Sequence, residues 1–125
     1  MSPTAGSTAG FAVHHRGGGS RPPVVVASGE LDLQAAPDLR ILLIELIEAG
    51  HRELVLDLSD ATFIDSTTIG VLTGRQRQLR GEDGELRIVC SNADLLRTFD
   101  ISGMARVFRI HRTVSDALAS IHQQP

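Results

Sequence analysis

Three consecutive polar residues, Asp65, Ser66 and Thr67, stand between an apolar strand-like run and a helix-like segment. The helical pattern is expected to begin at Ser66. A hydroxyl at a helix N-terminus lies beside free backbone N–H groups and the positive end of the helix dipole. A phosphoryl group on Ser66 or Thr67 would be stabilised there, so the segment suits a phosphorylation switch. The same residues also suit an ordinary first helical turn, and the residues alone favour neither interpretation.

Ser66 is poorly equipped to be a catalytic nucleophile. It lacks the Gly-x-Ser-x-Gly turn of α/β-hydrolases, and the five histidines fall at expected edge, loop or terminal positions. A receiver-like site with Asp57 as phosphoacceptor would need an adjacent acidic pair and a lysine, and the sequence contains no lysine. We therefore predict no catalytic residues. The alternative function from a different class is that of an enzyme that binds a small molecule or a nucleotide.

Four carboxylates are expected near strand ends and helix starts, where open α/β sheets bind ligands. They are Glu30, Asp32, Asp57 and Asp65, and we expect them to cluster around one site. Such a cluster could hold Mg²⁺, but aspartate is equally common at strand ends and helix caps. Asp65 is explained as the N-cap of the following helix. The prediction is therefore no metal and no cofactor.

The composition excludes several classes of protein. A formal net charge of -3 argues against nucleic-acid binding, and the run of Arg75, Arg77 and Arg80 is interpreted as a solvated helix face. The single cysteine, Cys90, stands in an apolar run and is interpreted as a core residue. With no apolar span long enough for a membrane and no secretory signal, the expected location is cytoplasmic.

Apolar periodicity predicts alternating strands and helices. The expected strands cover 11–15, 24–27, 54–58, 86–90 and 107–110, and the expected helices cover about 37–49, 66–80, 93–99 and the segment after Thr113. This order implies parallel βαβ units, and the first two strands form an antiparallel hairpin. The fold class is therefore α/β: a single domain over 10–122 with a mixed, mainly parallel sheet and packed helices, preceded by a disordered tail over 1–9.

Three local expectations are specific enough to be checked. A short turn is expected to connect the 54–58 strand directly to Asp65. Ile41 and Ile44 lie off the apolar stripe of the first helix, so either this helix is buried over a wide arc or the two residues face a partner; we favour burial. Gly70 and Gly74 lie one turn apart and are expected to let the second helix approach a neighbour closely.

The sequence resembles the STAS domain family, specifically the bacterial anti-sigma factor antagonists. The resemblance rests on Gly-Glu-Leu-Asp at 29–32, Val-Leu-Asp-Leu-Ser at 55–59 and above all Phe-Ile-Asp-Ser-Thr-Thr-Ile-Gly-Val-Leu at 63–72. Phe-Asp-Ile-Ser-Gly at 99–103, followed by Val-Phe at 107–108, is similar to the late helix and strand of the family. The match covers roughly 10–122 and implies a STAS-type fold.

The resemblance also implies a mechanism and partners. In the family, an anti-sigma factor with serine kinase activity phosphorylates the serine that follows the motif aspartate, which is Ser66 here. The unphosphorylated antagonist binds that kinase and frees a sigma factor; phosphorylation breaks the complex and a PP2C-type phosphatase resets it. The implied partner-binding residues are Glu30, Asp32, Asp57, Asp65, Ser66, Thr67 and Thr68.

One residue departs from the family pattern. Thr68 stands where the family usually has glycine, and it adds a β-branched side chain and a third hydroxyl. The departure predicts an altered choice of partner, slower phosphorylation, or a shift of the acceptor to Thr67 or Thr68. It also keeps a second function open, in which a STAS scaffold binds partners in a signalling or transporter complex without a phosphorylation cycle.

Overall fold

A mixed sheet with helices on both faces is built from residues 10–122, the part of the chain that the computed structural model describes. The predicted tail over residues 1–9 lies outside the described residues. In chain order the elements are β1 (Phe11–Gly18), β2 (Arg21–Leu31), α2 (Ala36–Glu48), β3 (Glu53–Asp57), β4 (Ala61–Ile64), α3 (Ser66–Arg80), β5 (Glu85–Val89), α4 (Ala93–Ser102), α5 (Met104–Val107), β6 (Ile110–His111) and α6 (Val114–His122). The strand order is β1-β2-β3-β5-β6, and β4 also pairs with β2.

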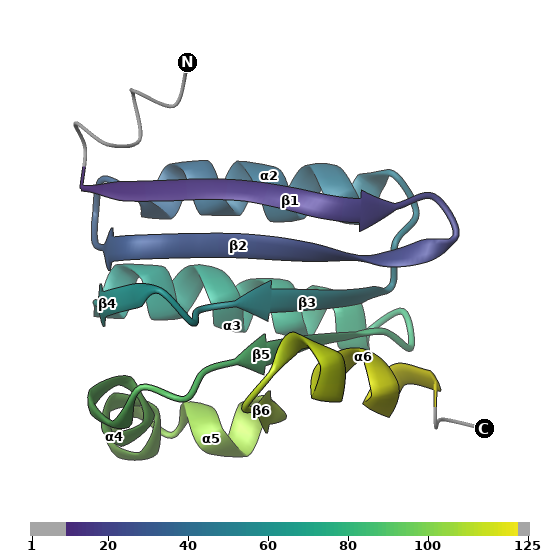
Figure 1. Ribbon diagram of the computed structural model, residues 1–125. Helices are drawn as coiled ribbons and strands as arrows, with labels where there is room; N and C mark the ends of the chain where they lie inside the picture. Colours follow the sequence, from purple (N-terminus) through teal and green to yellow (C-terminus); the bar gives the residue numbers. More distant parts are fainter. Residues whose placement is uncertain (1–9, 123–125) are drawn as a thin grey trace.

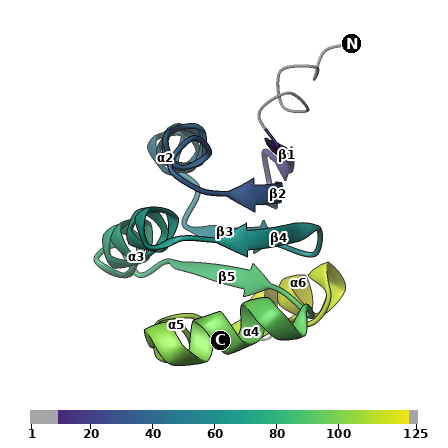
Figure 2. The same ribbon diagram turned by 90° about the vertical axis from the view of Figure 1, so that its left-hand side faces the viewer.

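The pairing confirms the predicted fold class. β1 and β2 form an antiparallel hairpin, and β2–β3, β2–β4, β3–β5 and β5–β6 are parallel. Helices α2 and α3 lie side by side on one face of the sheet, and α6 lies on the other (Figures 1 and 2). Within residues 10–122, no helix is both long and apolar enough to cross a membrane.

Burial on two faces explains why the centre of β3, residues 54–56, is a continuous apolar run. Leu54 and Leu56 point into the main core beneath α2 and α3. Val55 points the other way, into a smaller cluster with Val24, Val89 and Ala117 of α6. Successive residues of a strand face opposite sides of the sheet, so a strand covered on both sides must be apolar at almost every position.

Two predicted segments are wrong, one connection and one strand. The segment before Asp65 is not a simple turn, because β4 forms there and continues the parallel pairing along the end of β2. The expected strand over 107–110 is also wrong at its start. Residues Met104–Val107 form the short helix α5, and only Ile110–His111 pair with β5. Val107 and Phe108 are apolar enough for a strand, but they pack against the core from a helical turn and its end.

Two predictions about helix surfaces are also corrected. Ile41 on α2 is 52% exposed rather than buried, whereas Ile44 is half-buried. Gly70 and Gly74 do not receive a neighbouring element, because a Cβ atom added to either would have nothing within 4 Å. In both cases the helix itself was predicted correctly, but which of its outward-facing residues are covered by other elements was not.

Candidate functional site

Ser66 opens helix α3 at the exposed edge where β4 ends. Asp65 is the N-cap in an extended conformation, and its Oδ1 accepts a hydrogen bond of 2.9 Å from the backbone N–H of Thr68. This confirms the predicted cap, which satisfies one of the free N–H groups of the first turn. Ser66 and Thr67 follow with exposed side chains. The cap thus determines where the helix begins and leaves both hydroxyls facing solvent.

The end of β2 holds this helix start in place. The backbone N–H of Asp65 donates to the carbonyl oxygen of Leu31 at 3.2 Å, at the end of the β2–β4 ladder. The Thr68 hydroxyl donates to the same carbonyl at 2.9 Å and lies 3.4 Å from the carbonyl oxygen of Asp32. Two donors, one from backbone and one from a side chain, therefore join the first turn of α3 to β2.

The position of Thr68 corrects an expectation from the sequence. Its side chain is fully buried, so it does not form part of the exposed surface and its hydroxyl is not open to a kinase. The predicted roles as a partner contact or as a third acceptor are therefore contradicted. The residue acts from within, as a positioning residue for Ser66 and Thr67 in the turn above it.

The four predicted carboxylates are only partly brought together. Asp32 follows β2 directly beneath the start of α3, and its Oδ1 accepts from the backbone N–H of Gln34 at 3.0 Å. Glu30 is exposed and pairs across the β2–β4 ladder with Phe63. Both lie close to Asp65 in the ladder.

Asp57 lies apart from this group. It pairs with Val26 in the β2–β3 ladder, five residues before Leu31, which is about 16 Å along an extended strand. Its Oδ1 accepts from the backbone N–H of Ser59 at 2.9 Å and closes the turn after β3. The expectation that all four carboxylates share one site is wrong for Asp57. Among residues 10–122, no three His, Cys, Asp or Glu side chains are arranged to hold a metal ion.

A shallow apolar groove beside Thr67 was not found from the sequence. It lies between α2 and α3 and encloses about 340 Å³. The residues that line it are Leu33, Ala36, Pro37, Arg40, Ile41, Thr67 and Val71. Leu33 is 67% exposed and Ile41 52% exposed, so the α2–α3 groove presents large apolar side chains to solvent. The signals in the sequence were Leu33 in a polar loop and Ile41 off the stripe of α2.

Cys90 and His111 also lie together, at a cavity of about 330 Å³ next to α4 and β6. Burial raises the pKa of the Cys90 thiol. Burial, reinforced by the positive charge of Arg87, lowers the pKa of His111, with Asp116 and Glu85 opposing the effect. Cysteine nucleophiles need the opposite shifts, towards a thiolate and an imidazolium. This pair is therefore a structural contact of the β5–β6 edge, where Cys90 N–H donates to the His111 carbonyl.

Comparisons with known proteins agree with this geometry. The model of the STAS domain family matches residues 17–117. The chain is 35% identical over 83 residues to an anti-sigma-B factor antagonist of Bacillus subtilis (66% of this chain, 75% of the relative). It is 31% identical over 109 residues to an anti-sigma F factor antagonist of Paenibacillus polymyxa (86% of this chain, 90% of the relative).

Two solved structures share the fold at lower identity. An anti-sigma factor antagonist from Mycobacterium paratuberculosis superposes with a TM-score of 0.82 at 24% identity, covering 90% of this chain and 95% of that one. SpoIIAA in its unphosphorylated form superposes with a TM-score of 0.78 at 20% identity, covering 91% and 99%. On the family match and the two relatives, the chain belongs to the STAS domain family, in the group of the anti-sigma factor antagonists.

Proposed function

We propose that this chain is a cytoplasmic anti-sigma factor antagonist without catalytic activity. Unphosphorylated, it binds an anti-sigma factor that is also a serine kinase, and so releases a sigma factor for transcription. Phosphorylation on Ser66 ends the binding, and a PP2C-type phosphatase restores it. The relatives named anti-sigma factor antagonists support the class of partner. A structural neighbour, SpoIIAA, has also been solved in a phosphorylated form, and it shares the fold with a TM-score of 0.69.

The observation that carries the proposal is an exposed serine held at a capped helix start. Ser66 is open to solvent, while Asp65 and Thr68 fix the turn beneath it. A kinase needs an accessible hydroxyl on a defined backbone, and this turn provides one. The phosphoryl group would add about -1.5 to -2 charges next to Asp65.

The surroundings explain how that charge would disrupt a complex. The exposed apolar residues of the α2–α3 groove reach Thr67, one residue from the acceptor. A partner that buries this groove would also cover Ser66 and remove water from it. Placing a doubly charged group inside such a contact costs desolvation energy, and its charge adds to that of the neighbouring carboxylates of this chain. Asp32, Asp65 and Glu30 would contact the partner at the rim of the same surface.

Thr67 is the alternative acceptor, because its side chain is exposed and it lines the groove. Thr68 is excluded by its burial. The two remaining candidates can be separated by mass spectrometry of the protein isolated from its native cells, on intact protein and on peptides. We expect one phosphoryl group, located on Ser66.

A binding experiment then tests the switch itself. The cognate kinase is captured with Ser66→Ala, and its affinity is compared for Ser66→Ala, Ser66→Asp and Ser91→Asp. Ser91 is an exposed serine before α4, so Ser91→Asp adds the same charge away from the α2–α3 groove. We expect Ser66→Asp alone to weaken binding, by about 2 kcal/mol or more.

Equal affinity of Ser66→Ala and Ser66→Asp would contradict the proposed switch. Stable binding in both forms, together with no phosphoryl group under any growth condition, would establish the scaffold function instead. Measurable turnover of a small molecule would contradict both.

A further inference from the structure

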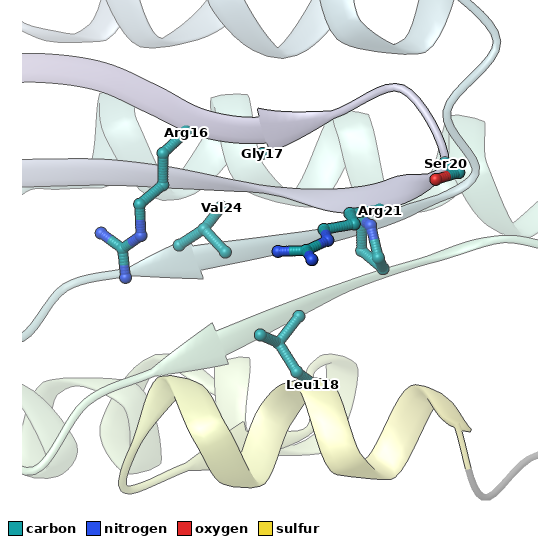
Figure 3. A pocket seen from close by; sticks show the side chains of 7 residues that line it. Arg16, Gly17, Ser20, Arg21, Val24 and Leu118 are labelled. Atoms are coloured by element: carbon teal, nitrogen blue, oxygen red, sulfur yellow. The ribbon is translucent and has the colours of Figure 1, made fainter.

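A second pocket lies on the face of the sheet that carries α6. It encloses about 440 Å³, within the range of small-molecule sites. The hairpin β1–β2 forms one side and α6 the other (Figure 3). The residues that line it are Arg16, Gly17, Ser20, Arg21, Pro22, Val24 and Leu118. We call it the hairpin pocket.

The chemistry of this pocket is divided between an apolar floor and a cationic rim. Val24 is 4% exposed, and Leu118 of α6 faces it across the pocket (Figure 3). Arg16 pairs with Val24 in the β1–β2 ladder, so both side chains lie on the same face of the sheet. The guanidinium groups of Arg16 and Arg21 extend to either side of Val24 (Figure 3).

The two arginines bring positive charge that other described residues do not neutralise. The five ion pairs among residues 10–122 involve Arg52, Arg80, Arg87 and Arg109 only. Arginine stays charged at all physiological pH values, and its planar group binds carboxylate, phosphate or sulfonate oxygens with two parallel hydrogen bonds. Two such groups above an apolar floor favour a ligand with an acidic group and an apolar body.

The backbone of the hairpin builds this arrangement. Gly17 has φ +81°, and a Cβ there would lie 3.0 Å from the carbonyl oxygen of Pro22. The β1–β2 register shifts between Arg16 and Gly18, beside this glycine. Gly17 thus allows the two strands to approach closely at the wall of the pocket that Gly17 and Pro22 form.

We propose that the hairpin pocket binds a small organic anion, with its acidic group between Arg16 and Arg21 and its apolar body against Val24 and Leu118. The inference does not depend on the switch. Ser66 begins α3, which lies on the opposite face of the sheet (Figures 1 and 2). No residue is shared between this pocket and the α2–α3 groove.

The test is a fluorescence titration of the full chain with 8-anilinonaphthalene-1-sulfonate, which carries a sulfonate on an apolar aromatic body. We expect saturation at one probe per chain. The double variant Arg16→Gln/Arg21→Gln should weaken binding by about tenfold or more, because two charge-assisted contacts are lost. The matched control is Arg97→Gln/Arg106→Gln, which removes the same charge at exposed positions that line neither pocket. Decanoate should displace the probe, and inorganic phosphate at the same concentration should not.

Equal loss of affinity in the two double variants would overturn the proposal, because general charge would then explain binding. Amide chemical shifts in labelled protein locate the probe. Changes at 16–24 and Leu118 support the hairpin pocket, whereas changes centred on Leu33 and Val71 place the probe in the α2–α3 groove and overturn it. Circular dichroism and thermal unfolding show that each variant is folded, so an absence of binding is informative.

Discussion

At the scale of single residues, Thr68 is the side chain that most directly affects the geometry of the candidate switch. Its hydroxyl reaches from the first turn of α3 to the Leu31 carbonyl of β2, in a position with no exposed surface. The resemblance to the family leads us to expect glycine there, and glycine has no side chain to make such a bond. The extra contact therefore restrains the turn that carries Ser66 and Thr67.

Removing only this hydroxyl tests the restraint. Thr68→Val keeps the shape, and the Leu31 carbonyl keeps its bond from the Asp65 N–H. We expect the free energy of unfolding to fall by about 1 kcal/mol, the usual net value of one hydrogen bond. Urea denaturation measures it. Thr67→Val, at the exposed neighbouring position, should change stability by less than about 0.5 kcal/mol. Equal effects of the two variants would show that the buried bond contributes nothing.

Cys90 provides a second residue-scale prediction. The thiol is 1% exposed, and burial raises its pKa, so little thiolate forms and little of it is accessible. We expect the native protein to react slowly with 5,5′-dithiobis(2-nitrobenzoic acid) at pH 8, and to react rapidly once it is unfolded in urea. Equally fast reaction in both states would show that the β5–α4 connection opens readily.

At the scale of elements, α3 carries a face that nothing within residues 10–122 covers. Gly70 and Gly74 lie one and two turns beyond Ser66, and neither position would crowd a side chain. Glycine inside a helix costs about 1 kcal/mol relative to alanine. No packing contact of the described structure offsets that cost, so the bare backbone is available to a partner that approaches along Ser66.

Alanine at both positions separates stability from binding. Gly70→Ala/Gly74→Ala should raise the free energy of unfolding by about 1 to 2 kcal/mol. The same variant should weaken binding of the anti-sigma factor, because two methyl groups then stand on the approached face. Thermal unfolding measures the stability, and calorimetric titration measures the affinity.

Gly29→Ala is the contrasting control. The φ angle of Gly29 is +83°, and a Cβ atom there would lie 2.2 Å from the Gly10 carbonyl oxygen, so this substitution should destabilise the protein. Increased stability with unchanged binding would remove the α3 face from the interface.

The elements also show where prediction from sequence succeeds. Helix α3 was predicted from Ser66 to Arg80 and is observed over those residues, because an aspartate cap and a continuous stripe mark it. Strand β4 was missed, since Ala61–Ile64 is short and its outward residues include the exposed Phe63. The apolar pair Val107 and Phe108 predicts a strand at the end of helix α5, because these residues suit either state. The periodicity of one helix or strand is visible in the sequence, but the elements that pack against it or pair with it are not.

In the candidate site, too, only the features set by neighbouring residues could be predicted from the sequence. The acceptor turn and its cap follow from the local order Asp65, Ser66, Thr67. The burial of Thr68 depends on a carbonyl 37 residues earlier in the chain, and the groove depends on how α2 lies beside α3. Contacts between segments that are distant in sequence set both features, and no local pattern reports them.

At the scale of the whole molecule, the sheet separates two different environments. Beneath α2 and α3 the buried side chains of the described residues carry no charge, whereas the α6 side holds a buried arginine, Arg87, paired with Glu53 and Glu85. His111 lies at the same edge of the sheet, and its Nε2 is buried without a hydrogen-bond partner among the described residues. A charge on this imidazole would face Arg87 and Arg109, with Asp116 and Glu85 in partial compensation.

This arrangement predicts a pH dependence of folding. The pKa of His111 is lowered in the folded state, so between that value and about 6.5 the unfolded chain binds more protons. Its contribution to stability is complete above about pH 6.5 and is lost as the pH falls through this window. Between pH 7.5 and pH 5, urea denaturation should show a smaller decrease in the free energy of unfolding for His111→Gln than for the unsubstituted protein. His14→Gln, on the exposed edge strand, is the matched control. Identical profiles for all three proteins would contradict the prediction.

The short connection over residues 58–60 makes chain length itself a constraint. Leu58 N–H donates to the Val89 carbonyl, Gly29 N–H donates to the Asp60 carbonyl, and Asp57 closes the turn between them. Insertion or deletion of one residue here would move β4 by one position along β2. The side chains of β4 that face the core would then face solvent, and those that face solvent would face the core. Ile64 would then point to solvent, and α3 would start in a different direction. Variation in length is thus tolerated far less at this connection than at the exposed turn over residues 81–83, and the spacing from Asp57 to Ser66 is part of what defines the site.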